Sequence, residues 1–97
     1  MNLEKVLLGH IGVDSGTIFI GDPCYLRSEI NPDDISHAIQ EAWDKQKFYA
    51  SMNYSLGHEG IGIVSSTYEG DGTYPVYGYF HHHDPRPVKI EIIFTEN

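Results

Sequence analysis

Aspartate stands beside glycine or proline in two short segments of this 97-residue chain, and apolar runs rich in β-branched and aromatic residues adjoin both. The first segment contains Asp14-Ser15-Gly16 and Gly21-Asp22-Pro23, and the second is Glu69-Gly70-Asp71-Gly72. Glycine adopts positive φ without steric cost, proline cannot donate to a β-ladder, and aspartate bonds to nearby backbone N–H groups. We therefore expect the chain to turn at both segments, with strands on either side.

The apolar runs predict antiparallel strands. Two hairpins are expected, and each has its turn at one of the glycine-bearing segments. In the first, Gly16 is free to take positive φ, and in the second, Asp-Gly between such runs is a strong hairpin signal. Their strands cover residues 6–13 and 17–20 in the first hairpin and residues 61–68 and 73–80 in the second. Alternating apolar and polar side chains over residues 88–94 predict another half-buried strand, and the aromatic segment 48–56 predicts a further one.

One amphipathic helix is predicted over residues 32–47, because Asn31 is a good N-cap and Pro32 suits the first helical position. Apolar side chains recur at helical spacing and form one stripe, made of Ile35, Ala38, Ile39, Ala42 and Trp43. Such a stripe packs against a sheet. The expected fold is therefore mainly β (α+β): a small twisted antiparallel sheet, arranged as a sandwich or an open barrel, with this helix packed on it. We expect a single domain covering residues 1–97.

Composition narrows the classes of function. The net charge of −8, from 14 acidic and 6 basic residues, disfavours general nucleic-acid binding because a phosphate backbone would be repelled. No run approaches the roughly 20 apolar residues of a transmembrane helix. The first residues also lack the basic segment and the apolar core of a signal peptide. We expect a cytoplasmic protein that does not bind membranes.

The turns supply candidate site residues, because their side chains would lie close together if both turns shared one rim of the sheet. The residues expected to bind a ligand there are Asp14, Asp22, Cys24, Tyr25, Asp71, Thr73 and Tyr74. Clustered carboxylates, with Glu69 added, could hold a hard cation. However, the twelve-residue spacing of a calcium loop is missing, and aspartate at a turn commonly caps its own backbone. We expect no metal and no cofactor.

Cys24 is the only cysteine, so the chain can form no internal disulfide. A nucleophilic thiol would need a base within hydrogen-bond reach, and His10, His58 or the run His81-His82-His83 could supply one. A lone cysteine is more often a small buried hydrophobe. The three histidines could also bind a metal, but only His81 and His83 would share a face of an extended strand. An exposed polar loop is the simpler interpretation.

Tyrosine is abundant in the second half of the chain. The aromatic residues near the second turn are Tyr68, Tyr74, Tyr77, Tyr79 and Phe80, and Tyr49 and Tyr54 precede them. Tyr77 and Tyr79 are expected on the face of their strand opposite Tyr74 and Phe80, so one set must be less buried. An exposed aromatic surface would suit a small ligand, a partner protein or a second copy of the chain.

Three segments together resemble a bacterial and phage domain family of unknown function that is marked by a Gly-Asp-Gly motif. They are Val13-Asp14-Ser15-Gly16, Asp22-Pro23-Cys24-Tyr25 and Gly70-Asp71-Gly72-Thr73-Tyr74-Pro75-Val76. The helix and the histidine run lie outside the resemblance. It implies that these turns belong to one site and that the protein comes from a phage or a bacterial cytosol. It also implies a role in binding a host protein or sequestering a signal molecule, and it assigns no catalytic residue.

Three hypotheses for function follow. The first is a non-catalytic binding module, expected to be a homo-oligomer, that binds a small ligand or a protein. The second is a small hydrolase or lyase that uses Cys24 or a carboxylate together with a histidine. The third is a protein that binds a divalent metal.

Overall fold

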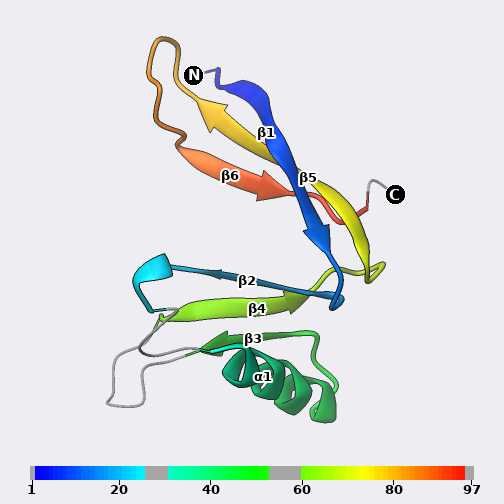
Figure 1. Cartoon of the computed structure of the whole chain (residues 1–97). Coiled ribbons are helices and arrows are strands. Elements are labelled where there is room, and N and C mark those ends of the chain that lie inside the picture. Colours follow the sequence, from blue (N-terminus) through cyan, green and yellow to red (C-terminus); the bar gives the residue numbers. More distant parts are fainter. Residues whose placement is uncertain (1, 26–30, 53–59, 96–97) are drawn as a thin grey trace.

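The computed structural model describes residues 2–25, 31–52 and 60–95 (Figure 1). The strands are β1 (Glu4–Val13), β2 (Thr17–Gly21), β3 (Tyr49–Met52), β4 (Gly62–Ser66), β5 (Gly72–Phe80) and β6 (Lys89–Ile92). A short 3-10 turn covers Pro23–Tyr25, and the α-helix, α1, covers Pro32–Asp44. The predicted class, mainly β with antiparallel pairing and one amphipathic helix, is confirmed. All strand pairs in the described residues are antiparallel.

The strands form two three-stranded sheets. The first sheet has the order β1-β5-β6 and the second the order β2-β4-β3. Both predicted hairpins are wrong, because β1 pairs with β5 and β2 pairs with β4. The segments at residues 14–16 and 67–71 therefore carry the chain from one sheet to the other (Figure 1). Their glycines do turn the chain, but glycine alone does not determine which strand the turned chain will pair with.

These two connections lie side by side, and we call them the crossovers. Gly16 and Gly70 have φ values of +70° and +86°, which glycine tolerates far better than other residues. The backbone N–H of Thr67 donates to Gly16 O at 3.2 Å. The hydroxyl groups of Thr67 and Tyr74 both donate to Gly70 O, each at 2.6 Å. Hydrogen bonds therefore join the crossovers at the corner where the two sheets meet.

Two small groups of buried side chains stabilise the fold. At the corner, Val13 and Tyr74 of the first sheet pack with Ile18 of the second. The partly buried side chains packed around them are Ile11, Ile92 and Phe94. Below the second sheet, α1 packs against β3 and β4 and buries Ile39 and Ala42. The predicted docking of the helical stripe on a sheet is therefore confirmed.

The helix begins as predicted and ends earlier. The Asn31 side chain accepts from the Asp34 N–H at 3.1 Å, and the Asp34 carboxylate accepts from the Asn31 N–H at 3.0 Å, which completes a capping box. The helix stops at Asp44 rather than residue 47, because Gln46 turns into the left-handed region with φ +61° and Lys47 N–H donates to Ala42 O at 2.8 Å. Of the strand predicted over residues 48–56, the structure describes Tyr49–Met52 as β3, and residues 53–56 lie outside the described ranges.

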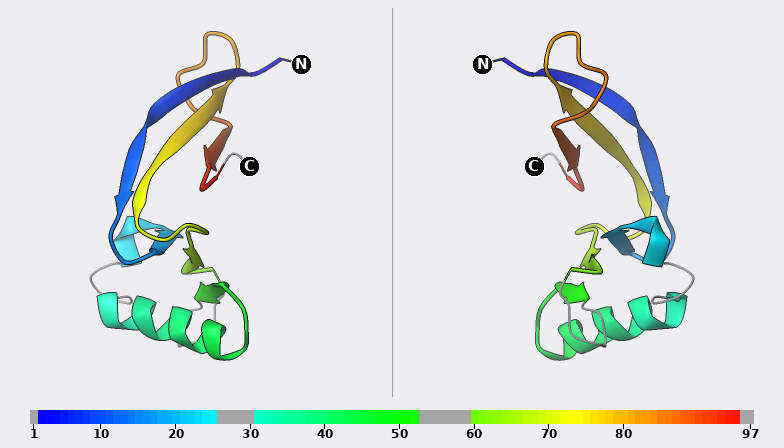
Figure 2. Two further views of the ribbon diagram at one scale, coloured as in Figure 1. Left: turned by 90° about the vertical axis from the view of Figure 1, so that its right-hand side faces the viewer. Right: turned by 90° about the vertical axis from the view of Figure 1, so that its left-hand side faces the viewer.

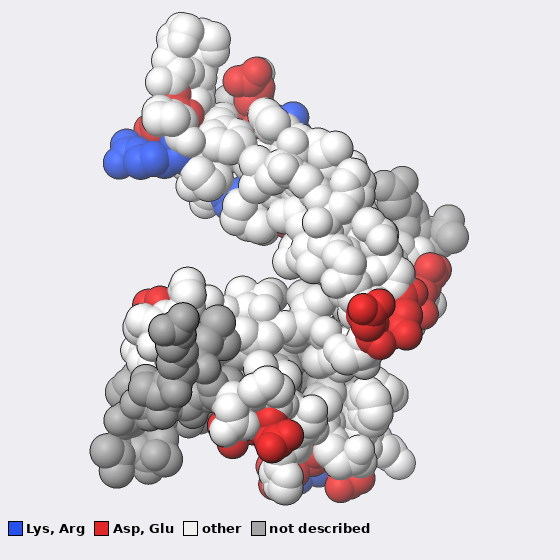
Figure 3. Space-filling model, in the orientation of Figure 1, with Lys and Arg blue, Asp and Glu red and all other residues white. Residues whose placement is uncertain are grey.

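The two sheets diverge from their common corner. Seen from the side, the first sheet rises from the crossovers while the second sheet and α1 extend below it (Figure 2). The radius of gyration is 15.2 Å, whereas a compact chain of this length has about 12.5 Å. A space-filling view shows a wide hollow between the sheets (Figure 3). Within residues 2–25, 31–52 and 60–95, no helix has the length and apolar character that crossing a membrane requires.

Candidate functional site

The crossovers bring together the first group of predicted site residues. Asp14 and Asp71 are exposed there, and Asp71 Oδ1 would lie 3.9 Å from a methyl group added at Gly16. Thr73 is exposed at the start of β5. Acidic side chains gather at this corner on the face that Figure 3 shows. The expectation that distant glycine-bearing turns meet is therefore right for these two turns.

The second group lies at the other end of β2. Thr17 pairs with Ser66 beside the crossovers, whereas Gly21 pairs with Gly62 at the opposite end of the strand. Asp22 and Cys24 follow Gly21, so the expectation of one shared rim is wrong for the Asp22 turn. Asp22 Oδ1 accepts from the Cys24 N–H at 2.9 Å. This is the local turn capping that aspartate commonly provides.

The Cys24 thiol lies in a setting that opposes nucleophilic activation. Desolvation of the sulfur, followed by the hydrogen bond and the negative charge of Asp22, raises the pKa of the Cys24 thiol. The desolvation is local, because the residue as a whole is exposed. A reactive thiol needs a lowered pKa and a cationic or basic neighbour. Tyr25 follows as a half-buried residue in the same 3-10 turn.

Tyr74 is a core residue. Its side chain is buried, its hydroxyl is bonded to Gly70 O, and its ring meets Phe94 edge to face at a centroid distance of 5.6 Å. These contacts join β5 to a crossover and to the segment after β6. The burial of Tyr74 leaves little of its side chain for contact with a ligand.

The histidine run forms a loop after β5. His83 has φ +65°, and the His82 and His83 ring centroids lie 3.8 Å apart. The pair that organises this loop is Asp84 with Arg86, whose guanidinium donates twice to the carboxylate at 3.0 and 3.1 Å. These hydrogen bonds lower the pKa of Asp84. In the described ranges, no three side chains of His, Cys, Asp or Glu come together as a metal ion would require; His58 lies outside them.

The tyrosines of β5 divide between its two faces. Tyr79 and Tyr77 lie on the outer face of the first sheet, opposite the face of the buried Tyr74. Lys5 Nζ lies 4.3 Å from the Tyr77 ring centroid, and Lys89 Nζ lies 4.1 Å from that of Tyr79. An ammonium group therefore lies next to each ring, so neither ring is fully open to solvent. Tyr54 lies outside the described residues.

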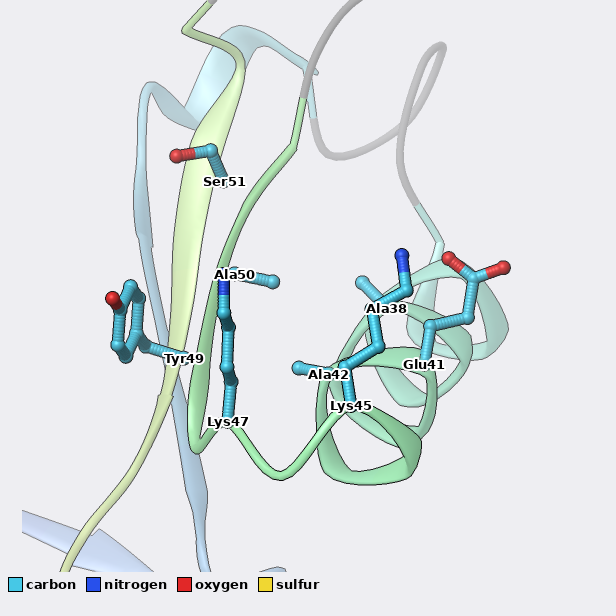
Figure 4. A pocket seen from close by; sticks show the side chains of 8 residues that line it. All are labelled: Ala38, Glu41, Ala42, Lys45, Lys47, Tyr49, Ala50 and Ser51. Atoms are coloured by element: carbon cyan, nitrogen blue, oxygen red, sulfur yellow. The ribbon is translucent and has the colours of Figure 1, made fainter.

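A pocket of about 370 Å³ lies between α1 and β3, on the side of β3 that faces away from β4 (Figure 4). Its floor is apolar and shallow because Ala38 and Ala42 of the helix face Ala50 of the strand. Larger side chains at these three positions would fill the space. Pockets of this size are typical of sites for small ligands or short peptide segments.

The strand wall of the pocket is a sheet edge, because among the described strands β3 pairs only with β4. Phe48 O accepts from the Ser66 N–H at 2.8 Å, and Met52 O accepts from the Ile61 N–H at 2.9 Å. Backbone groups alternate in direction along an antiparallel strand. The peptide groups of Tyr49 and Ser51 therefore point away from β4 and toward the pocket, while their side chains point to the opposite face of the sheet from Ala50 (Figure 4).

Two lysines give the pocket a local positive charge. Lys45 extends along α1 and Lys47 extends along β3 (Figure 4). They are two of only six basic residues in a chain of net charge −8. Glu41 also lines the pocket, and His37 Nε2 lies 3.6 Å from its carboxylate. The pocket thus combines backbone N–H and C=O groups, small apolar side chains and ammonium groups.

Sequence reasoning did not identify this pocket. It recognised Ala38 and Ala42 only as part of an apolar stripe. The sequence signal for this pocket is the pair of alanines on the helix, Ala38 and Ala42, followed by a short strand that contains Ala50. Such small side chains leave the helix and the strand edge incompletely packed. No protein-family model, curated protein or solved structure matches this chain significantly.

Proposed function

We propose that this chain is a non-catalytic cytoplasmic binding module that takes up an extended segment of another protein between α1 and β3. The observation that carries the proposal is the outer edge of β3, which pairs with no described strand and borders a pocket on the helix side. An extended segment placed there would pair with the edge and add a fourth strand to the second sheet.

The hydrogen bonds of such a complex follow from the strand. Tyr49 and Ser51 each offer one N–H and one C=O on the free side of β3. A partner strand would bond to these groups whatever its sequence, so they supply affinity. The alternate side chains of the partner would meet Ala42 and Ala50, where little depth is available. Small side chains are therefore favoured at that position of the partner.

The lysines add a preference for a carboxylate. Lys45 and Lys47 border the pocket, and an ammonium group binds an anion as a point charge. The remaining surface is strongly acidic and repels acidic segments in general. We infer that the preferred partner carries a single carboxylate, such as a chain terminus, next to an apolar stretch.

The raised pKa of the Cys24 thiol supports a binding role over a hydrolase or lyase built on this residue. Cys24 also lies outside the residues that line the pocket. Activity through Cys24 would be lost in Cys24→Ser, whereas peptide binding should be unchanged in that variant.

The proposal is tested with fluorescein-labelled hexapeptides of alternating valine and threonine, measured by fluorescence anisotropy. One peptide ends in a free α-carboxylate and its counterpart ends in an amide. The free carboxylate should bind saturably and at least about tenfold more tightly than the amide, which corresponds to about 1.4 kcal/mol. Lys45→Gln combined with Lys47→Gln should abolish this difference between the two peptides.

A backbone variant separates strand pairing from simple ion binding. Ser51→Pro removes an N–H that points away from β4, and proline is tolerated at such edge positions. It should abolish peptide binding while the free energy of unfolding stays close to that of Ser51→Ala, which keeps the N–H. If Ser51→Pro binds the peptide as well as Ser51→Ala, the partner does not pair with β3.

A further inference from the structure

Each sheet has one apolar face that is largely exposed, and these two faces look toward each other across the hollow in Figure 3. In the first sheet the apolar face carries exposed side chains from β1 and β6, which are Val6, Leu8 and Ile90. In the second sheet it carries Ile20, Ile63 and Tyr49, which are exposed as well. Water therefore contacts large apolar side chains on both of these surfaces.

The orientation of these faces follows from the strand registers. Ile63 pairs with Ile20, and in the same sheet Ile18 points to the same side, where it packs on Val13 and Tyr74 of the first sheet. Leu8 lies against Gly78, 3.2 Å from the position that a Gly78 Cβ would take. Gly78 shares its face with Tyr74, because the two residues are four apart in β5. Both apolar faces thus continue outward from the shared corner.

Within one chain, the faces touch only at the corner. Val13, Ile18 and Tyr74 are buried there, but the side chains farther along the strands are exposed. The hydrogen bond from the Thr67 N–H to Gly16 O links the crossovers at this corner, and the Thr67 and Tyr74 hydroxyl groups donate to Gly70 O of the second crossover. The walls of the hollow hold almost no charged side chains on the face that Figure 3 shows.

The exposed area has the size of an obligate interface. The chain exposes 7225 Å², whereas a compact protein of 11.0 kDa exposes about 5600 Å². The excess is roughly 1600 Å² over the whole surface of one chain, so two chains that covered it for each other would bury at most about 3200 Å². Obligate homodimers bury roughly 2000–5000 Å² in total.

We propose that a second copy of this chain closes the hollow, so that the first sheet of each copy faces the second sheet of the other across a shared core. A two-fold axis makes both junctions equivalent, and all four apolar faces are then covered. A second copy is a suitable partner because the first sheet of one copy would meet the second sheet of the other. These are the two sheets whose apolar side chains already pack together at the corner of each chain. The pocket between α1 and β3 stays outside the dimer, since α1 lies on the opposite side of the second sheet.

The charge distribution supports a second copy. Two chains of net charge −8 repel each other, so their contact must exclude acidic groups. Along the strands of the two facing surfaces, the described residues carry one carboxylate, Glu4, at the outer end of β1. A dimer would also present two copies of the α1–β3 pocket, which would strengthen the binding of a bivalent partner.

The test uses sedimentation velocity and light scattering on the full chain. The wild type should have twice the 11.0 kDa mass of one chain. Leu8→Lys should give a monomer, and Leu7→Lys should remain a dimer. Leu7 and Leu8 are matched in exposure, at 49% and 48%. Leu7 pairs with Tyr77 of the outer face, whereas Leu8, at the register shift between Leu7 and Gly9, lies against Gly78 of the inner face. Ile63→Glu, on the second sheet, should also give a monomer.

Mixing the two monomeric variants tests which faces meet. In a dimer of Leu8→Lys with Ile63→Glu, one junction is fully wild type and the other pairs a lysine with a glutamate. The mixture should therefore recover the doubled mass. A monomeric wild type, dissociation by Leu7→Lys, or failure of the mixture to dimerise would each overturn the proposal, as would a wild-type oligomer larger than two. Peptide binding by a monomeric Leu8→Lys would show that the proposed function holds independently.

Discussion

The backbone N–H of Thr67 donates to the carbonyl oxygen of Gly16 at 3.2 Å, although 51 residues separate them in the sequence. This bond continues the pairing of β2 with β4 past Thr17 and Ser66. It also brings together the two segments that lead into the first sheet. The side chain of Thr67 is fully buried and bonded to Gly70 O, so one residue joins both crossovers.

Thr67→Val tests the importance of this corner. Valine keeps the shape and the backbone N–H but removes the hydroxyl that donates to Gly70 O. The free energy of unfolding should fall by about 1–2 kcal/mol in urea denaturation. Thr73→Val is the matched control at an exposed position of β5, and it should change stability by no more than about 0.5 kcal/mol. Equal effects of both variants would mean that the Thr67 hydroxyl adds nothing to stability.

Gly62→Ala tests the packing inside the second sheet. A methyl group at this position would lie 2.3 Å from the Phe19 ring and 3.0 Å from Ile20 O. The ring would have to move, and overpacking of this kind costs about 1–3 kcal/mol of stability. Gly12→Ala is the control, because no atom other than those of its chain neighbours lies within 4 Å of the added methyl group. Thermal unfolding should show a clearly lower midpoint for Gly62→Ala alone.

Gln46→Gly should stabilise the protein. Gln46 holds φ +61° at the end of α1, which costs a side-chain-bearing residue about 1 kcal/mol relative to glycine. Gln40→Gly, in the middle of the same helix, should instead destabilise by about 1 kcal/mol. The midpoint of urea denaturation should therefore rise for Gln46→Gly and fall for Gln40→Gly. Destabilisation by Gln46→Gly would contradict the left-handed helix end.

Tyr79 and Glu91 predict a pH dependence of stability. The Tyr79 hydroxyl donates to Glu91 Oε1 at 2.8 Å, and this bond is the largest cause of the lowered pKa of Glu91. Because the folded-state pKa lies below the ordinary value of 4.5, Glu91 contributes stability above pH 4.5. That contribution is lost as the pH falls through the lowered pKa. Tyr79→Phe should shift the Glu91 titration, followed by NMR, to higher pH and reduce this loss.

The sequence predicts where the helix and the strands lie better than it predicts which strands pair with each other. The N-terminal end of α1 is local, because Asn31, Pro32 and Asp34 lie within one turn, and it was predicted correctly. The pairing of β1 with β5 depends on contacts between residues that are 59 to 76 positions apart, and nothing in Asp14-Ser15-Gly16 distinguishes a hairpin from a crossover. The hydrogen bonds of Thr67 are what make the difference, and they exist only after the chain has folded.

The candidate site was less accessible to prediction for a related reason. Polar residues at turns can be recognised as candidate site residues because the chemistry of their side chains follows directly from the sequence. The groups proposed to bind a partner are the backbone atoms of Tyr49 and Ser51, which have no signature in the sequence. Their availability depends on β3 being an edge strand and on Ala42 and Ala50 leaving space beside α1.

Amide hydrogen exchange at β3 tests the proposed strand addition most directly. In the free protein, the N–H groups of Tyr49 and Ser51 should exchange much faster than that of Ala50, which faces β4. Saturating hexapeptide with a free carboxylate should slow exchange at Tyr49 and Ser51 by at least about tenfold and leave Ala50 nearly unchanged. Unchanged exchange at both residues under saturating peptide would show that no strand pairs with this edge.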